Sequence, residues 1–127
     1  MGHDGSYELF FWRQESMMTL SSRAIYESLR DGRPVDGLAL LAIDELLAAV
    51  VASFPGARFE PEDPVRVVWR APNGEDGFEV AWSAQHLAVD CWHLGEVALT
   101  AFVDLAARYG CPLYDPQSGQ RSRLRAP

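Results

Sequence analysis

The sequence contains no lysine, and all eleven of its basic residues are arginine. Eighteen acidic residues outnumber them, so the formal net charge is −7. Because contacts to phosphates need clustered positive charge, direct binding to nucleic acid is not expected. The charge favours a basic protein partner, since opposite charges speed the encounter of two proteins. The same acidity also serves solubility alone, and this simpler interpretation stands beside the first.

Cysteines and long apolar runs are equally scarce. Cys91 and Cys111 each lie among apolar residues, and two thiols in a chain without a secretory signal are expected to be buried and reduced. No apolar stretch reaches the roughly 18 residues that cross a bilayer. The longest, 38–54, is interrupted by Asp44 and Glu45. We therefore expect a cytoplasmic location and no membrane association.

No motif for catalysis or metal binding stands out. His86 and Asp90 would face one side of a strand. Cys91 and His93 would face the other side, so the four side chains cannot converge on one metal ion. His86 is then an ordinary surface histidine beside an acid. No glycine-rich phosphate loop follows a predicted strand. We expect no catalytic residue, no metal and no cofactor, so the chain is not predicted to be an enzyme.

Hydrophobic periodicity and turn residues predict an alternation of strands and helices. Strands are expected at 7–12, 65–70, 78–82, 86–92 and 111–117, and helices at 19–30, 45–54 and 94–109. Thr19 and Asp44 are the expected N-caps. The segment 38–54 is apolar almost all round and must be buried, whereas 57–64 is expected to be an acidic surface loop. Asp115-Pro116-Gln117 is interpreted as a structural turn.

This order predicts a single α+β domain over 1–127, with flexible ends at 1–6 and 118–127. We expect a ferredoxin-like sandwich, a βαββαβ core with an additional strand and helix, in which helices cover one face of a mainly antiparallel sheet. Phe10, Trp12 and Trp92 would then lie on the bare face. Exposed aromatic residues rimmed by charge mark an interface, unless the acidic loop or the arginine-rich tail covers them.

Several short motifs together resemble a known family. They are Tyr7-Glu8-Leu9-Phe10-Phe11-Trp12, Ala24-Ile25-Tyr26, Phe54-Pro55-Gly56, Phe78-Glu79-Val80-Ala81-Trp82-Ser83 and Cys111-Pro112-Leu113-Tyr114-Asp115-Pro116-Gln117. The chain from Tyr7 to Gly119 resembles a family of small uncharacterised bacterial proteins that open with a Tyr-x-Leu-x-x-Trp strand and close with a Tyr-Asp-Pro-Gln strand. The resemblance implies an immunity-type protein encoded beside a polymorphic toxin gene, and it brings no catalytic residues.

The leading hypothesis is therefore an immunity protein that covers the active site of a basic toxin. The predicted partner-binding residues are Trp12, Glu60, Glu62, Asp63, Glu75, Asp76, Glu79, Asp90 and Trp92. Two alternatives stay open. One is a small-molecule-binding or enzymatic α+β domain with a cleft between the sheet and the 57–64 loop. The other is a bare sheet face that serves homodimerisation.

Overall fold

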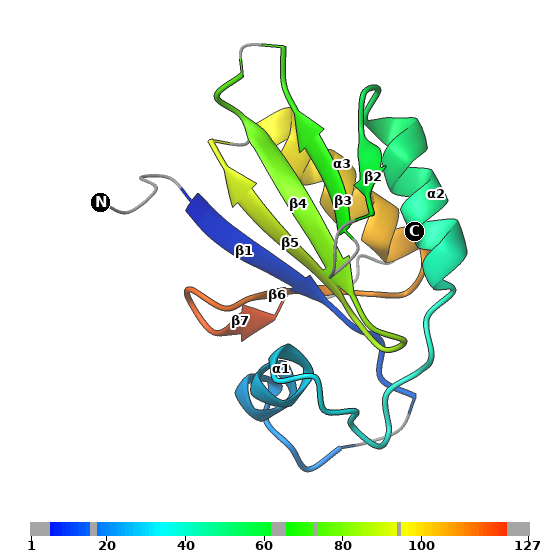
Figure 1. The fold of residues 1–127 in the computed structure, drawn as a ribbon. Helices are drawn as coiled ribbons and strands as arrows, with labels where there is room; N and C mark the ends of the chain where they lie inside the picture. The colour runs from blue at the N-terminus through cyan, green and yellow to red at the C-terminus, as the bar shows by residue number, and fades with distance from the viewer. Residues whose placement is uncertain (1–5, 16–17, 62–65, 73, 94, 122–127) are drawn as a thin grey trace.

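The computed structural model describes residues 6–15, 18–61, 66–72, 74–93 and 95–121 (Figure 1). The strands are β1 (Ser6–Phe11), β2 (Arg58–Glu60), β3 (Arg66–Arg70), β4 (Gly77–Trp82), β5 (Leu87–Trp92), β6 (Leu113–Asp115) and β7 (Gln120–Arg121). The helices are α1 (Ser22–Arg30), α2 (Ile43–Ser53) and α3 (Glu96–Arg108). The strands form one antiparallel sheet in the order β2-β3-β4-β5-β1-β6-β7. The α+β class is thus confirmed.

The first strand lies inside the sheet because it is apolar on both of its alternations. β1 pairs with β5 on one side and with β6 on the other. Leu9 and Phe11 point into the hydrophobic core beneath α2 and α3. Phe10 points the opposite way, and Trp12 follows it into a second core. A strand with two apolar faces therefore joins two cores.

Helices cover both faces of the sheet, so the prediction of helices on one face is wrong. α2 and α3 lie on one face, and α1 lies on the other (Figure 1). α1 buries Ile25, Tyr26 and Leu29. These side chains belong to the same core as Phe10 and Trp12. The apolar side of α1 is buried against the aromatic side chains of β1, as the apolar side of an amphipathic helix must be in a folded domain.

Helix starts and one strand differ from the sequence prediction. α1 begins after Ser21, whose hydroxyl oxygen accepts a hydrogen bond from the Ala24 N–H at 3.1 Å, and not after Thr19. Asp44 lies in the first turn of α2, where its charge favours the helix dipole, and is not the N-cap. Part of the expected acidic loop forms β2. β7 falls within 118–127, and residues 122–127 lie outside the described part of the chain.

α2 is less buried than its composition predicts. Leu46, Leu47 and Val50 are buried against the sheet and α3. Ala48 and Ala52, on the opposite side, are exposed. The expectation that the segment 38–54 is buried is therefore wrong for the side of α2 that carries Ala48 and Ala52. Among the described residues, no helix is both long enough and apolar enough to cross a membrane.

Candidate functional site

The sheet face opposite α2 and α3 has a covered half and an open half. α1 packs over the half that carries Phe10 and Tyr114, and both of these side chains are buried. In Figure 1 none of the three helices lies over the other half. We call this half the open face, and define it by Glu8, Arg66, Arg70, Glu79, Asp90 and Trp92. On it, charged side chains of four adjacent strands, β1, β5, β4 and β3, lie side by side.

Three carboxylates form a row across the open face. The strand register places Glu8 of β1 opposite Asp90 of β5, and Asp90 opposite Glu79 of β4. Side chains that pair directly on one face of an antiparallel sheet lie about 5 Å apart at Cβ, and like charges in that arrangement repel. The row therefore concentrates negative charge in the middle of the sheet.

Partial burial makes these charges still less favourable. It raises the pKa of the Glu8 carboxyl, and the charge of Asp90 raises that pKa further. Partial burial also raises the pKa of Asp90, with a second contribution from Glu79. The Arg30 guanidinium, at the end of α1, lowers the pKa of both groups. A further cation placed over the row would stabilise both ionised carboxylates.

Glu8 is held in place from two directions. The Tyr26 hydroxyl of α1 donates a hydrogen bond to Glu8 Oε1 at 2.6 Å. From the other side, the Gln117 amide accepts from the Glu8 N–H at 2.7 Å and donates to the Glu8 carbonyl oxygen at 3.1 Å. The Asp115 carboxylate accepts a hydrogen bond from the Gln117 N–H at 2.9 Å. The structural role expected for the Asp-Pro-Gln turn is confirmed, and its effect is to fix this strand.

Arginines border the row on the β3 side. Arg66 Nη1 lies 2.7 Å from Glu79 Oε1, and both side chains are about one-third exposed. Arg70 places its guanidinium carbon 5.5 Å from the Trp92 ring centroid. Such a cation–π contact at a partly exposed site contributes about 0.5–1 kcal/mol. The open face thus combines an acidic centre with an aromatic ring held by an arginine.

The Trp92 ring lies against Gly77, its cross-strand neighbour. A Cβ atom at position 77 would come within 2.9 Å of Trp92 Cζ2 and within 2.5 Å of the Trp69 carbonyl oxygen. Only glycine fits between the two. The glycine therefore fixes where the ring lies on the open face.

Gly77→Ala is expected to lower the free energy of unfolding by about 1–3 kcal/mol, because the added methyl must displace backbone or the Trp92 ring. Urea unfolding followed by circular dichroism measures it. Gly95→Ala is the matched control, since nothing lies within 4 Å of a Cβ there. That change should cost about 1 kcal/mol or less. Equal costs for the two variants would contradict the close approach at Gly77.

The predicted partner-binding residues divide into three groups. Glu79, Asp90 and Trp92 come together on the open face. Glu60 lies on the same side of the sheet, opposite Arg66, but at the β2 edge. The others do not join this group: Glu75 and Asp76 lie between β3 and β4, Trp12 is buried, and Glu62 and Asp63 lie outside the described residues.

The prediction that Trp12 binds a partner is wrong, because the exposed fraction of this residue is 0%. Its ring lies 5.3 Å from the Tyr114 ring and 6.1 Å from the Phe10 ring, centroid to centroid. Both of those rings are also buried, in the core between α1 and the sheet. The alternation assigned Phe10 and Trp12 to the correct face of the sheet. α1, which was not among the segments expected to cover them, packs over that half of the face.

His86 is a buried residue and not a surface one. It is 7% exposed and stacks on Phe10, with ring centroids 4.7 Å apart. Its Nδ1 lies 2.6 Å from Ser83 Oγ. Burial lowers the pKa of His86 to about 4, so the ring is neutral at pH 7. Its role is to complete the core under α1.

Groups suited to metal or thiol chemistry do not gather in the described part of the chain. No cluster of three or more His, Cys, Asp or Glu side chains suited to a metal ion is found among those residues. Cys91 is buried, and burial raises the pKa of its thiol to about 12. A thiol with that pKa stays protonated at neutral pH and is a poor nucleophile.

Sequence reasoning did not find Glu8, Tyr26, Arg30 or Arg66. Glu8 could have been found, because it shares an alternation with Phe10 and faces the same side of β1. The positions of Tyr26 and Arg30 beside Glu8 could not have been predicted, because they depend on where α1 packs. No protein-family model matches this chain, and no curated protein sequence matches it either.

Proposed function

We propose that this protein is a protein-binding module, most concretely an immunity protein that neutralises a bacterial toxin by covering its active site. The proposal is supported by the row of Glu8, Asp90 and Glu79, which lies on the open face, the half of its sheet face that α1 does not cover (Figure 1). The two carboxyls with raised pKa gain most from a cation of the partner. The toxin surface it fits is therefore basic.

Trp92 supplies the apolar part of the proposed contact. It is half-buried, lies beside the acidic row, and its ring is held between Gly77 and Arg70. Interface hot spots are enriched in tryptophan and arginine that are fixed before binding, because less conformational entropy is then lost. Trp92, and not Trp12, is thus the aromatic anchor in this proposal. The negative field around the row speeds encounter with a basic surface.

Asp90→Arg is expected to weaken toxin binding by about 2 kcal/mol or more, roughly 30-fold in Kd, because it places a cation in the centre of the row. The test uses as the partner a toxin encoded next to the gene, which the proposal requires, and titration calorimetry measures its affinity. Asp104→Arg, at an exposed position of α3, is the control with the same charge change. Co-expression should rescue growth with the wild type and the control but not with Asp90→Arg.

Failure of the wild type to rescue growth would contradict the immunity function. Rescue by both variants would instead remove the open face from the interface. The affinity should also fall as the pH is lowered through the raised pKa values of Glu8 and Asp90. A bound cation favours the ionised carboxylates, so binding near these pKa values releases protons. The affinity is therefore lower at lower pH.

Two further proposals concern the fold arrangement and the location of the protein in the cell. We propose a ferredoxin-like core made of β1, α2, β4, β5, α3 and β6, supported by the adjacent strand order β4-β5-β1-β6 and by α2 and α3 on one face. The β2–β3 pair, α1 and β7 would be additions to it. A cytoplasmic location is proposed as well, since an immunity protein of this kind meets its toxin inside the producing cell.

A further inference from the structure

The sheet ends in an open strand edge at β2. Within the described residues, β2 pairs with β3 and stands at the end of the strand order. A strand at the end of a sheet presents N–H and C=O groups that can pair with another chain. β2 comes from the stretch 57–64, which the proposed toxin contact on the open face does not use.

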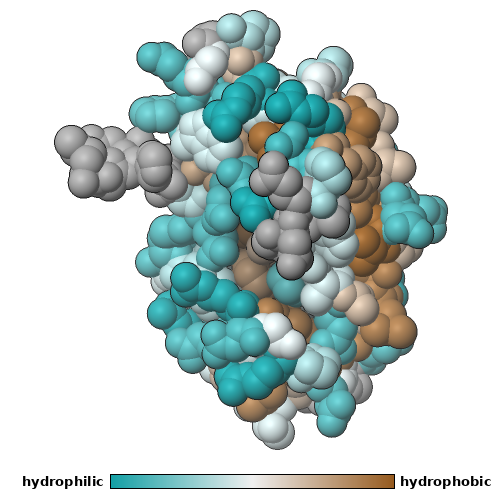
Figure 2. Space-filling view, viewed as in Figure 1, coloured by the Kyte–Doolittle hydropathy of each residue, from teal (hydrophilic) through white to brown (hydrophobic). Residues whose placement is uncertain are grey.

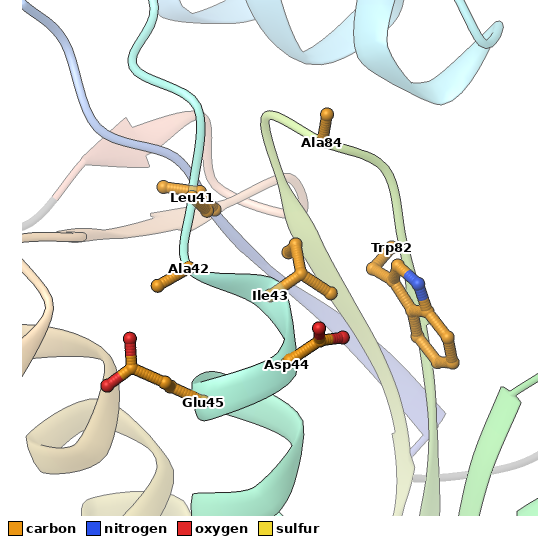
Figure 3. A pocket seen from close by; sticks show the side chains of 7 residues that line it. All are labelled: Leu41, Ala42, Ile43, Asp44, Glu45, Trp82 and Ala84. Atoms are coloured by element: carbon orange, nitrogen blue, oxygen red, sulfur yellow. The ribbon is translucent and has the colours of Figure 1, made fainter.

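An apolar patch adjoins this edge on the helix side of the sheet. Phe59 of β2 is 50% exposed, and its ring lies 6.3 Å from the Trp82 ring. Figure 3 shows Asp44 of α2 pointing toward Trp82, while Glu45 points away from it. Ala48 follows Asp44 by four residues, one helical turn on, and so lies on the same side of α2.

We call this group the edge patch. It consists of Ile43, Ala48, Phe59 and Trp82, together with Val51, which follows Ala48 by three residues and so lies on the same side of α2. Figure 2 shows apolar colour gathered along the side of the molecule where Figure 1 places α2. Together with Leu41, Ile43 and Trp82 also line a shallow hollow of about 660 Å³ at the start of α2. Apolar surface beside an unpaired strand edge is typical of an interface.

β2 carries one positive and one negative charge. Arg58 and Glu60 flank Phe59, lie on the opposite face of the sheet from it, and pair within the chain, with Arg58 Nε 2.9 Å from Glu60 Oε2. If a second β2 pairs antiparallel with Phe59 opposite Phe59, then Arg58 of each copy also faces Glu60 of the other, and the two ion pairs join into one network of four alternating charges. A two-fold axis generates such self-complementary contacts. Shifting the register by one residue on each side breaks this pairing of opposite charges.

We propose that two copies of this chain associate through their β2 edges, antiparallel and centred on Phe59. The two sheets become one continuous sheet, and the two edge patches meet on its helix side. The apolar patch supplies the contact area, while Arg58 and Glu60 fix the register, because exposed ion pairs contribute more to specificity than to stability. The open face stays uncovered, so the dimer leaves the proposed toxin site available.

The test is the oligomeric state of the full chain, measured by sedimentation velocity over a concentration series. The wild type should be a dimer. Phe59→Asp should weaken self-association at least tenfold, because it places two carboxylates at the two-fold axis. Arg58→Glu alone and Glu60→Arg alone should each weaken it as well, since each brings like charges together. An equimolar mixture of the two charge variants should dimerise again, because each then meets the opposite charges.

Two controls separate this contact from others. Trp92→Asp, on the open face, should stay dimeric, and circular dichroism should show every variant folded. A monomeric wild type, or a dimer that tolerates Phe59→Asp and both charge variants, would overturn the proposal. A dimer broken by Trp92→Asp but not by Phe59→Asp would also overturn it, because the contact would then be the open face. Failure of the mixture to restore the dimer would overturn the proposed register.

Discussion

Trp12→Ala is expected to lower the free energy of unfolding by about 3–5 kcal/mol. Trp12 is fully buried and packs against Phe10 and Tyr114 in the core under α1. Removing the indole both loses buried apolar area and leaves a cavity that the surrounding rings cannot fill. Because domains of this size are stable by only about 5–15 kcal/mol, the variant should be close to unfolding at 37 °C. Chemical denaturation monitored by far-ultraviolet circular dichroism gives the value.

Trp92→Ala is the matched control, because it removes the same side chain from the open face. Trp92 is only half-buried, and its neighbours are Gly77 and the flexible end of Arg70. Its loss should cost about 1–2 kcal/mol, and it should reduce toxin affinity if the proposed function holds. A loss of stability that is equal for the two tryptophans would contradict the different burial of the two faces.

Acid is expected to destabilise the protein through His86, by about 3 kcal/mol between pH 6.5 and 4. Burial lowers the pKa of His86 in the folded state to about 4, whereas its ordinary value is 6.5. Above pH 6.5 the ring is neutral in both states, so the full stability is present. As the pH falls below 6.5, only the unfolded state takes up the proton, and stability falls until the folded pKa is reached. A difference of one pKa unit corresponds to about 1.4 kcal/mol.

His86→Gln should remove this pH dependence, because glutamine does not titrate. The measurement is urea unfolding at about pH 7 and about pH 4.5, with the wild type and the variant compared at each. The comparison is needed because Glu8 and Asp90, whose pKa values are raised, act in the opposite direction and gain stability from protonation. His93→Gln, at an exposed position, is the control and should keep the wild-type slope. An unchanged slope in His86→Gln would contradict the burial of that ring.

The largest difference between prediction and structure concerns α1. Its amphipathic pattern predicted a helix near 19–30, and the helix is present. The pattern did not reveal which face of the sheet the helix covers. Phe10 and Trp12 were correctly assigned to the face that turned out to lie under α1. Because the helix was expected on the other face, these rings were expected to be exposed or covered by the acidic loop or the arginine-rich tail, whereas α1 buries them.

β2 was missed for a related reason. Its three residues carry two charges and lie between Pro55 and Pro61, so local propensity favours a loop. Pairing with β3 at the sheet edge outweighs that propensity. The acidic residues Glu60, Glu62 and Asp63 were consequently grouped as one loop, although Glu60 is part of the sheet. β2 is a strand because it pairs with β3, the next strand along the chain, and the three residues of β2 do not by themselves indicate that pairing.

Periodicity and local turn chemistry were enough to predict the α+β class, the three helices near 19–30, 45–54 and 94–109, and the turn at Asp115-Pro116-Gln117. Which half of the sheet face opposite α2 and α3 is covered by α1 depends on the packing of the whole domain. That choice buries Trp12 and His86 and leaves Glu8, Asp90 and Glu79 together in one row. The physical reason is that helix packing and strand register join residues up to about a hundred positions apart, and the free energy of those contacts is not contained in any short stretch of chain.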